Sequence, residues 1–79
     1  MAVSVTQAAT KVVPASTGRH LETVKNTGAN PVTLAKTSGL TFGAGFSLAA
    51  AGSMQVDLDS GEELYGICGS GLTTTIEVL

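Results

Sequence analysis

Residues 54–71 read MQVDLDSGEELYGICGSG, and this stretch decides the fold. From Met54 to Asp59 apolar and polar residues alternate strictly, which is typical of a strand with one dry and one wet face. Asp59-Ser60-Gly61-Glu62 then predicts a turn. Residues 64–68 are apolar or glycine at every position, as expected of a central strand that is buried on both faces. Glycine and serine at 69–71 reverse the chain again.

Outside this stretch the chain repeats the same pattern of short β-prone runs and turns. The further strand candidates lie at 10–15, 19–25, 32–34, 40–48 and 72–78. Turn signals recur roughly every 8 to 12 residues, which is typical of an all-β sandwich or barrel, and no stretch sustains a helical period. The predicted fold class is therefore all-β: a small, jelly-roll-like antiparallel β-sandwich with six or seven short strands.

Three segments carry specific expectations. Residues 26–31, NTGANP, separate two β-prone runs and predict a hairpin loop. In the run 19–25 the apolar Leu21 and Val24 are three residues apart, so this run contains a bulge or is not a plain strand. From 40 to 48 the bulky residues share one parity with glycines between them. This predicts a bent or bulged strand that another backbone approaches closely.

Residues 1–10 form either a first strand or an extended arm, and residues 11–79 form a single β-sandwich domain. The segment 1–10 has no large apolar side chain beyond Val3 and Val5. We expect it to add little to a core that starts at Val12, so that deleting residues 2–10 leaves the domain folded. Its uncharged, β-prone backbone suits addition to the sheet edge of a neighbour. The predicted partner contacts are Ala2, Val3, Ser4, Val5, Thr6 and Gln7.

The composition points to an assembly rather than to a free monomer. Only 13% of the residues are charged, against about 25% in a typical soluble domain, while 43% are hydrophobic and the mean hydropathy is +0.34. A core of this size rarely supplies more than ~3–5 kcal/mol without disulfides, metals or oligomerisation. Cys68 is the single cysteine, so no intrachain disulfide can form. The sequence therefore predicts a homo-oligomer, and we expect a trimer.

Charge and hydropathy also argue against two classes of partner. The net charge is −2 and the four cations are scattered, which leaves no basic stripe to neutralise nucleic-acid phosphates. No segment approaches the ~20 apolar residues that a membrane span needs, and the N-terminus lacks the pattern of a signal peptide. We expect neither a nucleic-acid partner nor a membrane partner.

Three sequence patterns are of a type found in metal, phosphate or catalytic sites, and each has a simpler structural explanation. The acidic run 57–63 does not fit a calcium loop, because Gly61 stands where an oxygen ligand is needed and Cys68 where the bidentate Glu would fall. The glycines at 66–71 lack the Gly-Lys-Ser/Thr ending of a phosphate-binding loop. His20 and Cys68 could act as base and nucleophile, but burial in the most apolar strand makes a thiol inert. We predict no catalytic residue, no metal site and no cofactor, and hence no enzyme.

Several short motifs follow one another over about residues 12–79. They are Ser16-Thr17-Gly18-Arg19, Val24-Lys25-Asn26-Thr27-Gly28, Asn30-Pro31-Val32-Thr33-Leu34, Gly45-Phe46-Ser47-Leu48, Gly52-Ser53, Leu64-Tyr65-Gly66-Ile67 and a Thr-rich final strand ending Val78-Leu79. In this order they resemble the small β proteins in the structural modules of tailed bacteriophages. Glu22 departs from the pattern, since an apolar residue is expected at its place.

The resemblance implies a virion structural protein, above all a capsid decoration or cement protein. Its partners would be further copies of itself and the major capsid protein, at capsid subunit junctions. It would be made in the cytoplasm of the bacterial host and end on the capsid surface. The alternative is a small tail-fibre, baseplate or head-fibre domain that binds a host receptor or glycan. Such sites usually present aromatic side chains, and Tyr65 is the aromatic residue that we expect to be free for this role.

Overall fold

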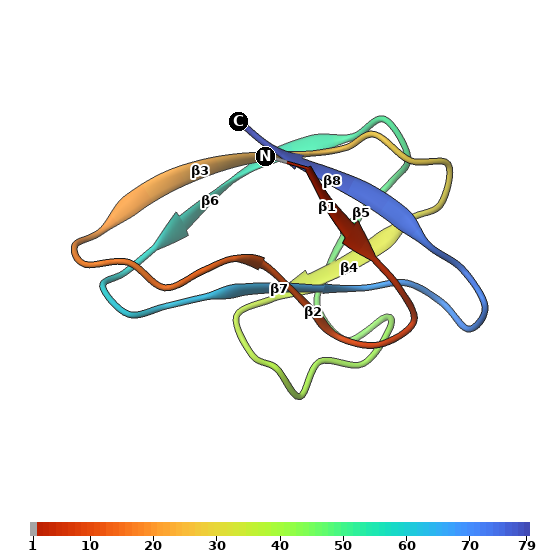
Figure 1. Ribbon diagram of the computed structural model, residues 1–79, viewed down its shortest axis with the longest axis horizontal. Helices are drawn as coiled ribbons and strands as arrows, with labels where there is room; N and C mark the ends of the chain where they lie inside the picture. Colours follow the sequence, from red (N-terminus) through yellow and green to blue (C-terminus); the bar gives the residue numbers. More distant parts are fainter. Residues whose placement is uncertain (1) are drawn as a thin grey trace.

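The computed structural model describes residues 2–79, with His20 described through its backbone alone, and contains eight strands and no helix in that range (Figure 1). The strands are β1 (Ala2–Val5), β2 (Thr10–Val13), β3 (His20–Asn26), β4 (Val32–Ala35), β5 (Phe46–Leu48), β6 (Ser53–Leu58), β7 (Leu64–Ile67) and β8 (Thr74–Val78). The all-β prediction is confirmed, but six or seven strands was too few. The two segments left open by the sequence, at the N-terminus and at 19–25, are both strands.

The strands form two four-stranded sheets in which every pairing is antiparallel. The strand order is β1-β8-β3-β6 in the first sheet and β2-β7-β4-β5 in the second. Only β4 and β5 are neighbours both in the chain and in a sheet. The predicted hairpin at 26–31 is therefore wrong: β3 and β4 belong to different sheets, and this segment carries the chain from one sheet to the other (Figure 1).

Both sheets contribute side chains to one buried aliphatic cluster. The first sheet supplies Val5, Val24, Val56, Leu58 and Ile76, the second supplies Val12, Val13, Val32, Leu34, Leu48 and Leu64, and Cys68 joins them. The alternation predicted for residues 54–59 is confirmed, because Val56 and Leu58 face this cluster. The prediction of a central strand at 64–68 is also confirmed, since β7 lies between β2 and β4.

The prediction that the core starts at Val12 is wrong. Val5 is fully buried in the cluster, and Val3 packs against it. The cause is the pairing of β1 with β8, which places Val3 opposite Ile76 and Val5 opposite Thr74. Residues 2–5 are thus an edge strand of the chain's own first sheet.

Strand β3 is regular, contrary to the bulge expected between Leu21 and Val24. Its six consecutive pairs with β6 show no shift in register. Leu21 breaks the apolar alternation because it faces solvent with 65% of its surface exposed, while Glu22 shares the face of Val24 and is half-buried. An irregular register occurs instead in β2, between Lys11 and Val13.

The long strand predicted at 40–48 is also wrong, because only Phe46–Leu48 is a strand. Before it, the backbone N–H of Ala44 donates to the Thr41 carbonyl at 3.1 Å, and Gly43 has φ +89°, so the chain turns there. The close backbone approach that we predicted is found at Gly45. A Cβ added at this position would lie 2.5 Å from the carbonyl oxygen of Leu34.

Candidate interaction surface

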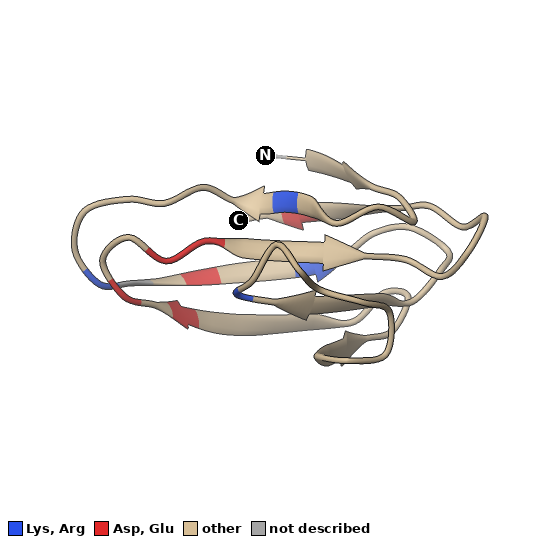
Figure 2. Cartoon of the chain, turned by 90° about the horizontal axis from the view of Figure 1, so that it is seen from below, with Lys and Arg blue, Asp and Glu red and all other residues tan. Residues whose placement is uncertain are grey.

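The two ends of the molecule differ in charge. Four loops meet at the end that lies to the right in Figure 1, and no Lys, Arg, Asp or Glu occurs in any of them (Figure 2). These loops are 6–9, 27–31, 49–52 and 69–73, and we call them together the uncharged end. The loops 14–19 and 59–63 lie at the opposite end, and they carry Arg19, Asp59, Glu62 and Glu63.

The charged side chains at and near the opposite end form ion pairs with one another. Lys11 Nζ lies 2.7 Å from Glu63, Lys36 Nζ lies 3.1 Å from Glu62, and the Arg19 guanidinium binds Asp57. The N–H of Asp59, and after it Lys36, lower the pKa of Glu62; Lys11, and after it Tyr65, lower the pKa of Glu63. Such exposed pairs add little stability. Their effect is that the acidic run 57–63 is neutralised largely by the chain's own cations.

At the uncharged end, the Asn26 side chain is fully buried and uses all of its hydrogen-bonding atoms. Its Nδ2 donates to the carbonyls of Asn30 at 2.7 Å and Leu48 at 3.2 Å. Its Oδ1 accepts from the Gly28 N–H at 3.1 Å and from the Thr74 hydroxyl at 2.6 Å. One buried amide therefore joins the loop 27–31 to β5 and β8, and hence ties the two sheets together.

Further hydrogen bonds tie the four loops to one another or to the strands beside them. They run from Asn26 N to Gly52 O (2.8 Å), from Cys68 N to Thr6 O (2.8 Å), from Gly71 N to Gln7 Oε1 (2.7 Å) and from Asn30 Nδ2 to Thr73 O (2.8 Å). Loops held in this way lose little conformational entropy when a partner binds. The uncharged end is therefore a preorganised surface.

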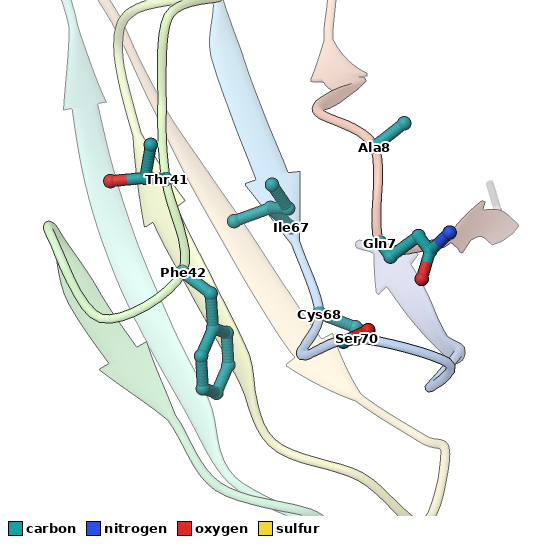
Figure 3. Close-up of a pocket in the computed structure, with 7 residues that line it drawn as sticks. All are labelled: Gln7, Ala8, Thr41, Phe42, Ile67, Cys68 and Ser70. Atoms are coloured by element: carbon teal, nitrogen blue, oxygen red, sulfur yellow. The ribbon is translucent and has the colours of Figure 1, made fainter.

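An open hollow of about 500 Å³ lies beside the uncharged end (Figure 3). Phe42 from the loop 36–45 stands on one side of it and Gln7 and Ala8 on the other, with Cys68 and Ser70 between them. The Phe42 side chain is 49% exposed. None of the residues that line the hollow is charged, so it suits a neutral partner surface.

The predicted partner contacts occupy two different places. Thr6 and Gln7 belong to the uncharged end, where both are exposed. Ala2 and Ser4 are exposed on β1, while Val3 and Val5 face the core, and the burial of Val5 removes its side chain from any contact surface. Sequence reasoning missed Phe42 and the other three loops. The absence of charge in these loops is visible in the sequence, but only the strand pairing brings them together.

The other residues considered for chemistry are placed as follows. The Tyr65 side chain, which we expected to be free, is half-buried, and its hydroxyl donates to Glu63 at 2.9 Å. The large exposed aromatic side chains are instead Phe42 and Phe46. The His20 side chain lies outside the described part of the structure, which leaves its predicted relation to Cys68 open.

Among the described residues no three His, Cys, Asp or Glu form a group that could hold a metal ion. No helix in residues 2–79 is long and apolar enough to span a membrane.

Cys68 is expected to react with thiol reagents far more slowly in the folded protein than in the denatured chain. Its side chain is buried, its Sγ donates to the Val5 carbonyl at 3.6 Å, and burial raises the pKa of the thiol, so little reactive thiolate is present near neutral pH. Labelling rates with and without denaturant measure the difference. Equal rates in the two conditions would show that the thiol is accessible.

Comparisons of the chain with protein-family models, with curated proteins and with solved structures give no match.

Proposed function

We propose that this chain is a bacteriophage virion structural protein, a capsid decoration protein built as a jelly-roll β-sandwich. The strand orders β1-β8-β3-β6 and β2-β7-β4-β5 support this fold, because every connection except that between β4 and β5 crosses from one four-stranded sheet to the other, the arrangement expected of two Greek keys. Capsid and lectin domains both use jelly rolls, so the fold alone does not assign the function. The preorganised, uncharged end is the observation that carries the proposal.

In this proposal the uncharged end binds the major capsid protein at the junctions between capsid subunits. Burying it desolvates no charged side chain, and its loops are already ordered by the bonds of Asn26 and Gln7. The opposite end, with its ion pairs, stays in water on the outside of the capsid. A protein that binds only the assembled shell stabilises it by mass action, in proportion to RT ln(1 + [L]/Kd).

A charge placed at the uncharged end is expected to weaken capsid binding at least about tenfold, since an unpaired buried charge costs well above 1.4 kcal/mol. Ala29→Lys and Ala50→Lys test this, because both side chains are exposed in loops of that end. Ser60→Lys, in the loop 59–63, is the matched control and should bind normally. The assay is co-sedimentation with empty capsids of the phage that encodes the chain. Unchanged binding by both uncharged-end variants would contradict the proposal.

The second candidate is a fibre or baseplate domain that binds a neutral host glycan, and one observation favours it. The exposed Phe42 ring lines a hollow next to the side chains of Gln7, Thr41 and Ser70, which could bond sugar hydroxyls. Binding of the wild-type protein to host surface polysaccharide, lost in Phe42→Ala and accompanied by no binding to capsids, would favour this function over decoration.

A further inference from the structure

The four edge strands of the two sheets differ in how they are protected. Strand β2 has an irregular register and is followed by Pro14, β5 has three residues and β1 has four. Strand β6 has six residues, all paired in regular register with β3. Proteins usually blunt an edge of this kind with a bulge, a proline or a cover, because it can add another strand. Within residues 2–79, β6 is the longest and most regular edge.

The backbone of β6 presents hydrogen-bonding groups on its free side. Peptide groups in an antiparallel ladder point alternately toward and away from the partner strand. The carbonyl of Gly52 accepts from β3, at Asn26 N, whereas the carbonyl of Asp57 accepts from Lys36 Nζ at 2.8 Å on the other side. The alternation therefore directs the N–H and C=O groups of Ser53 and Gln55 to the free edge, together with the carbonyl of Asp57.

An apolar hollow of about 250 Å³ lies beside this edge. It is lined by Lys36, Phe46, Met54, Gln55, Val56 and Asp57. Phe46 is 57% exposed and Met54 is half-buried. Ser53 and Gln55 in this part of β6 are exposed, and β5, which supplies Phe46, is only three residues long. The edge thus combines the outward-facing backbone groups of Ser53 and Gln55 with the exposed Phe46 and the half-buried Met54, the two features that strand addition uses.

We infer that β6 pairs with β6 of a second copy, antiparallel and about a twofold axis, with Gln55 opposite the same residue of the other copy. This contact goes beyond the proposed function and supplies a surface for the homo-oligomer that the sequence predicts. A twofold contact joins two copies, whereas the sequence led us to expect three.

The sequence of β6 is complementary to itself in this register. Met54 then lies opposite Val56 on the core side, and Ser53 lies opposite Asp57 on the outer side. No like charges oppose each other, whereas a register centred on Asp57 would place two carboxylates face to face, which is unfavourable. Lys36 would leave the Asp57 carbonyl and keep its contact with Glu62 at 3.1 Å. Each Phe46 would be brought to the joined edge, where its ring is covered.

Cysteine cross-linking of the full chain tests the register. Gln55→Cys is expected to give a covalent dimer of twice 7.9 kDa on mild oxidation, since residues facing each other across a ladder meet the Cα spacing of a disulfide. Ser4→Cys, exposed on the other edge strand of the same sheet, is the matched control and should not cross-link. The wild type should not cross-link either, because Cys68 is buried.

Sedimentation equilibrium gives the second measurement. The wild type is expected to be a dimer, and Phe46→Ala to raise its dissociation constant at least about tenfold, as for a central aromatic contact. Phe46 is mostly exposed in the single chain, so the variant should fold normally, which circular dichroism can verify. A monomer, a trimer, or cross-linking through Ser4→Cys in place of Gln55→Cys would overturn the inference. Neither experiment uses capsids, so a negative result here would not contradict the proposed decoration function. A protein that forms the dimer but does not bind capsids would contradict the decoration function alone.

Discussion

The Asn26→Ala variant is expected to melt roughly 10–25 °C below the wild type. The substitution removes four hydrogen bonds made by a fully buried side chain to Gly28, Asn30, Leu48 and Thr74. Buried polar groups left unsatisfied cost about 1–3 kcal/mol each. Even a total loss of about 3 kcal/mol corresponds to such a shift, because 1 kcal/mol moves the melting temperature of a domain of this size by roughly 4–8 °C.

Thermal unfolding followed by circular dichroism measures the effect, and Asn30→Ala is the matched control. The Asn30 side chain makes one bond at this end, from Nδ2 to the Thr73 carbonyl at 2.8 Å, and that bond is exposed. Its removal should cost about 1 kcal/mol or less. If both variants melted within a few degrees of the wild type, Asn26 would not be the residue that joins the loops.

The sequence predicted strands better than it predicted how they are joined. The alternation at 54–59 and the apolar run at 64–68 report local burial, and both became strands of the expected kind. The run 26–31 has the residues of a hairpin turn, but these residues serve equally well for a crossing between sheets. The deciding feature is Asn26, whose buried amide bonds to groups as distant in sequence as Leu48 and Thr74. No local pattern shows such bonds.

The segments 40–48 and 2–5 were misjudged for related reasons. Shared parity between 40 and 48 imitates a strand, yet the left-handed Gly43 turns the chain before β5 begins. The side chains of residues 2–5 are small, and their place in the core depends on pairing with β8, which lies at the other end of the sequence. Local composition cannot indicate a strand that is stabilised mainly by its distant neighbour.

The candidate surface was predictable only in part. From the low charge we predicted a surface that contacts protein, and the structure has four uncharged loops gathered at one end. Sequence reasoning placed the predicted contacts in one continuous segment, of which Thr6 and Gln7 lie on that surface. The loops 27–31, 49–52 and 69–73 are far apart in the chain and meet only through the alternation of strands between the sheets. Such a surface is a property of the topology.

Deleting residues 2–9 is expected to unfold the isolated chain, in contrast to the expectation from the sequence. The deletion exposes the edge of β8 from Thr74 to Glu77 and removes the buried Val5, which alone is worth about 1.5–3 kcal/mol. The N–H of Cys68 also loses its acceptor, the carbonyl of Thr6. Together these losses match the ~3–5 kcal/mol that a core of this size supplies. Chemical denaturation of both chains measures the difference.

Adding the deleted segment as a separate peptide separates strand pairing from a general effect of truncation. A peptide of residues 2–9 should restore the fold of the shortened chain, because main-chain bonds to β8 and the Val5 side chain can be supplied from outside. The same peptide with Val5→Asp is the control and should fail, since a carboxylate would enter the apolar cluster. If the shortened chain instead melts like the full one, β1 is dispensable for folding. Its free backbone would then be available to a neighbour, as the sequence first suggested.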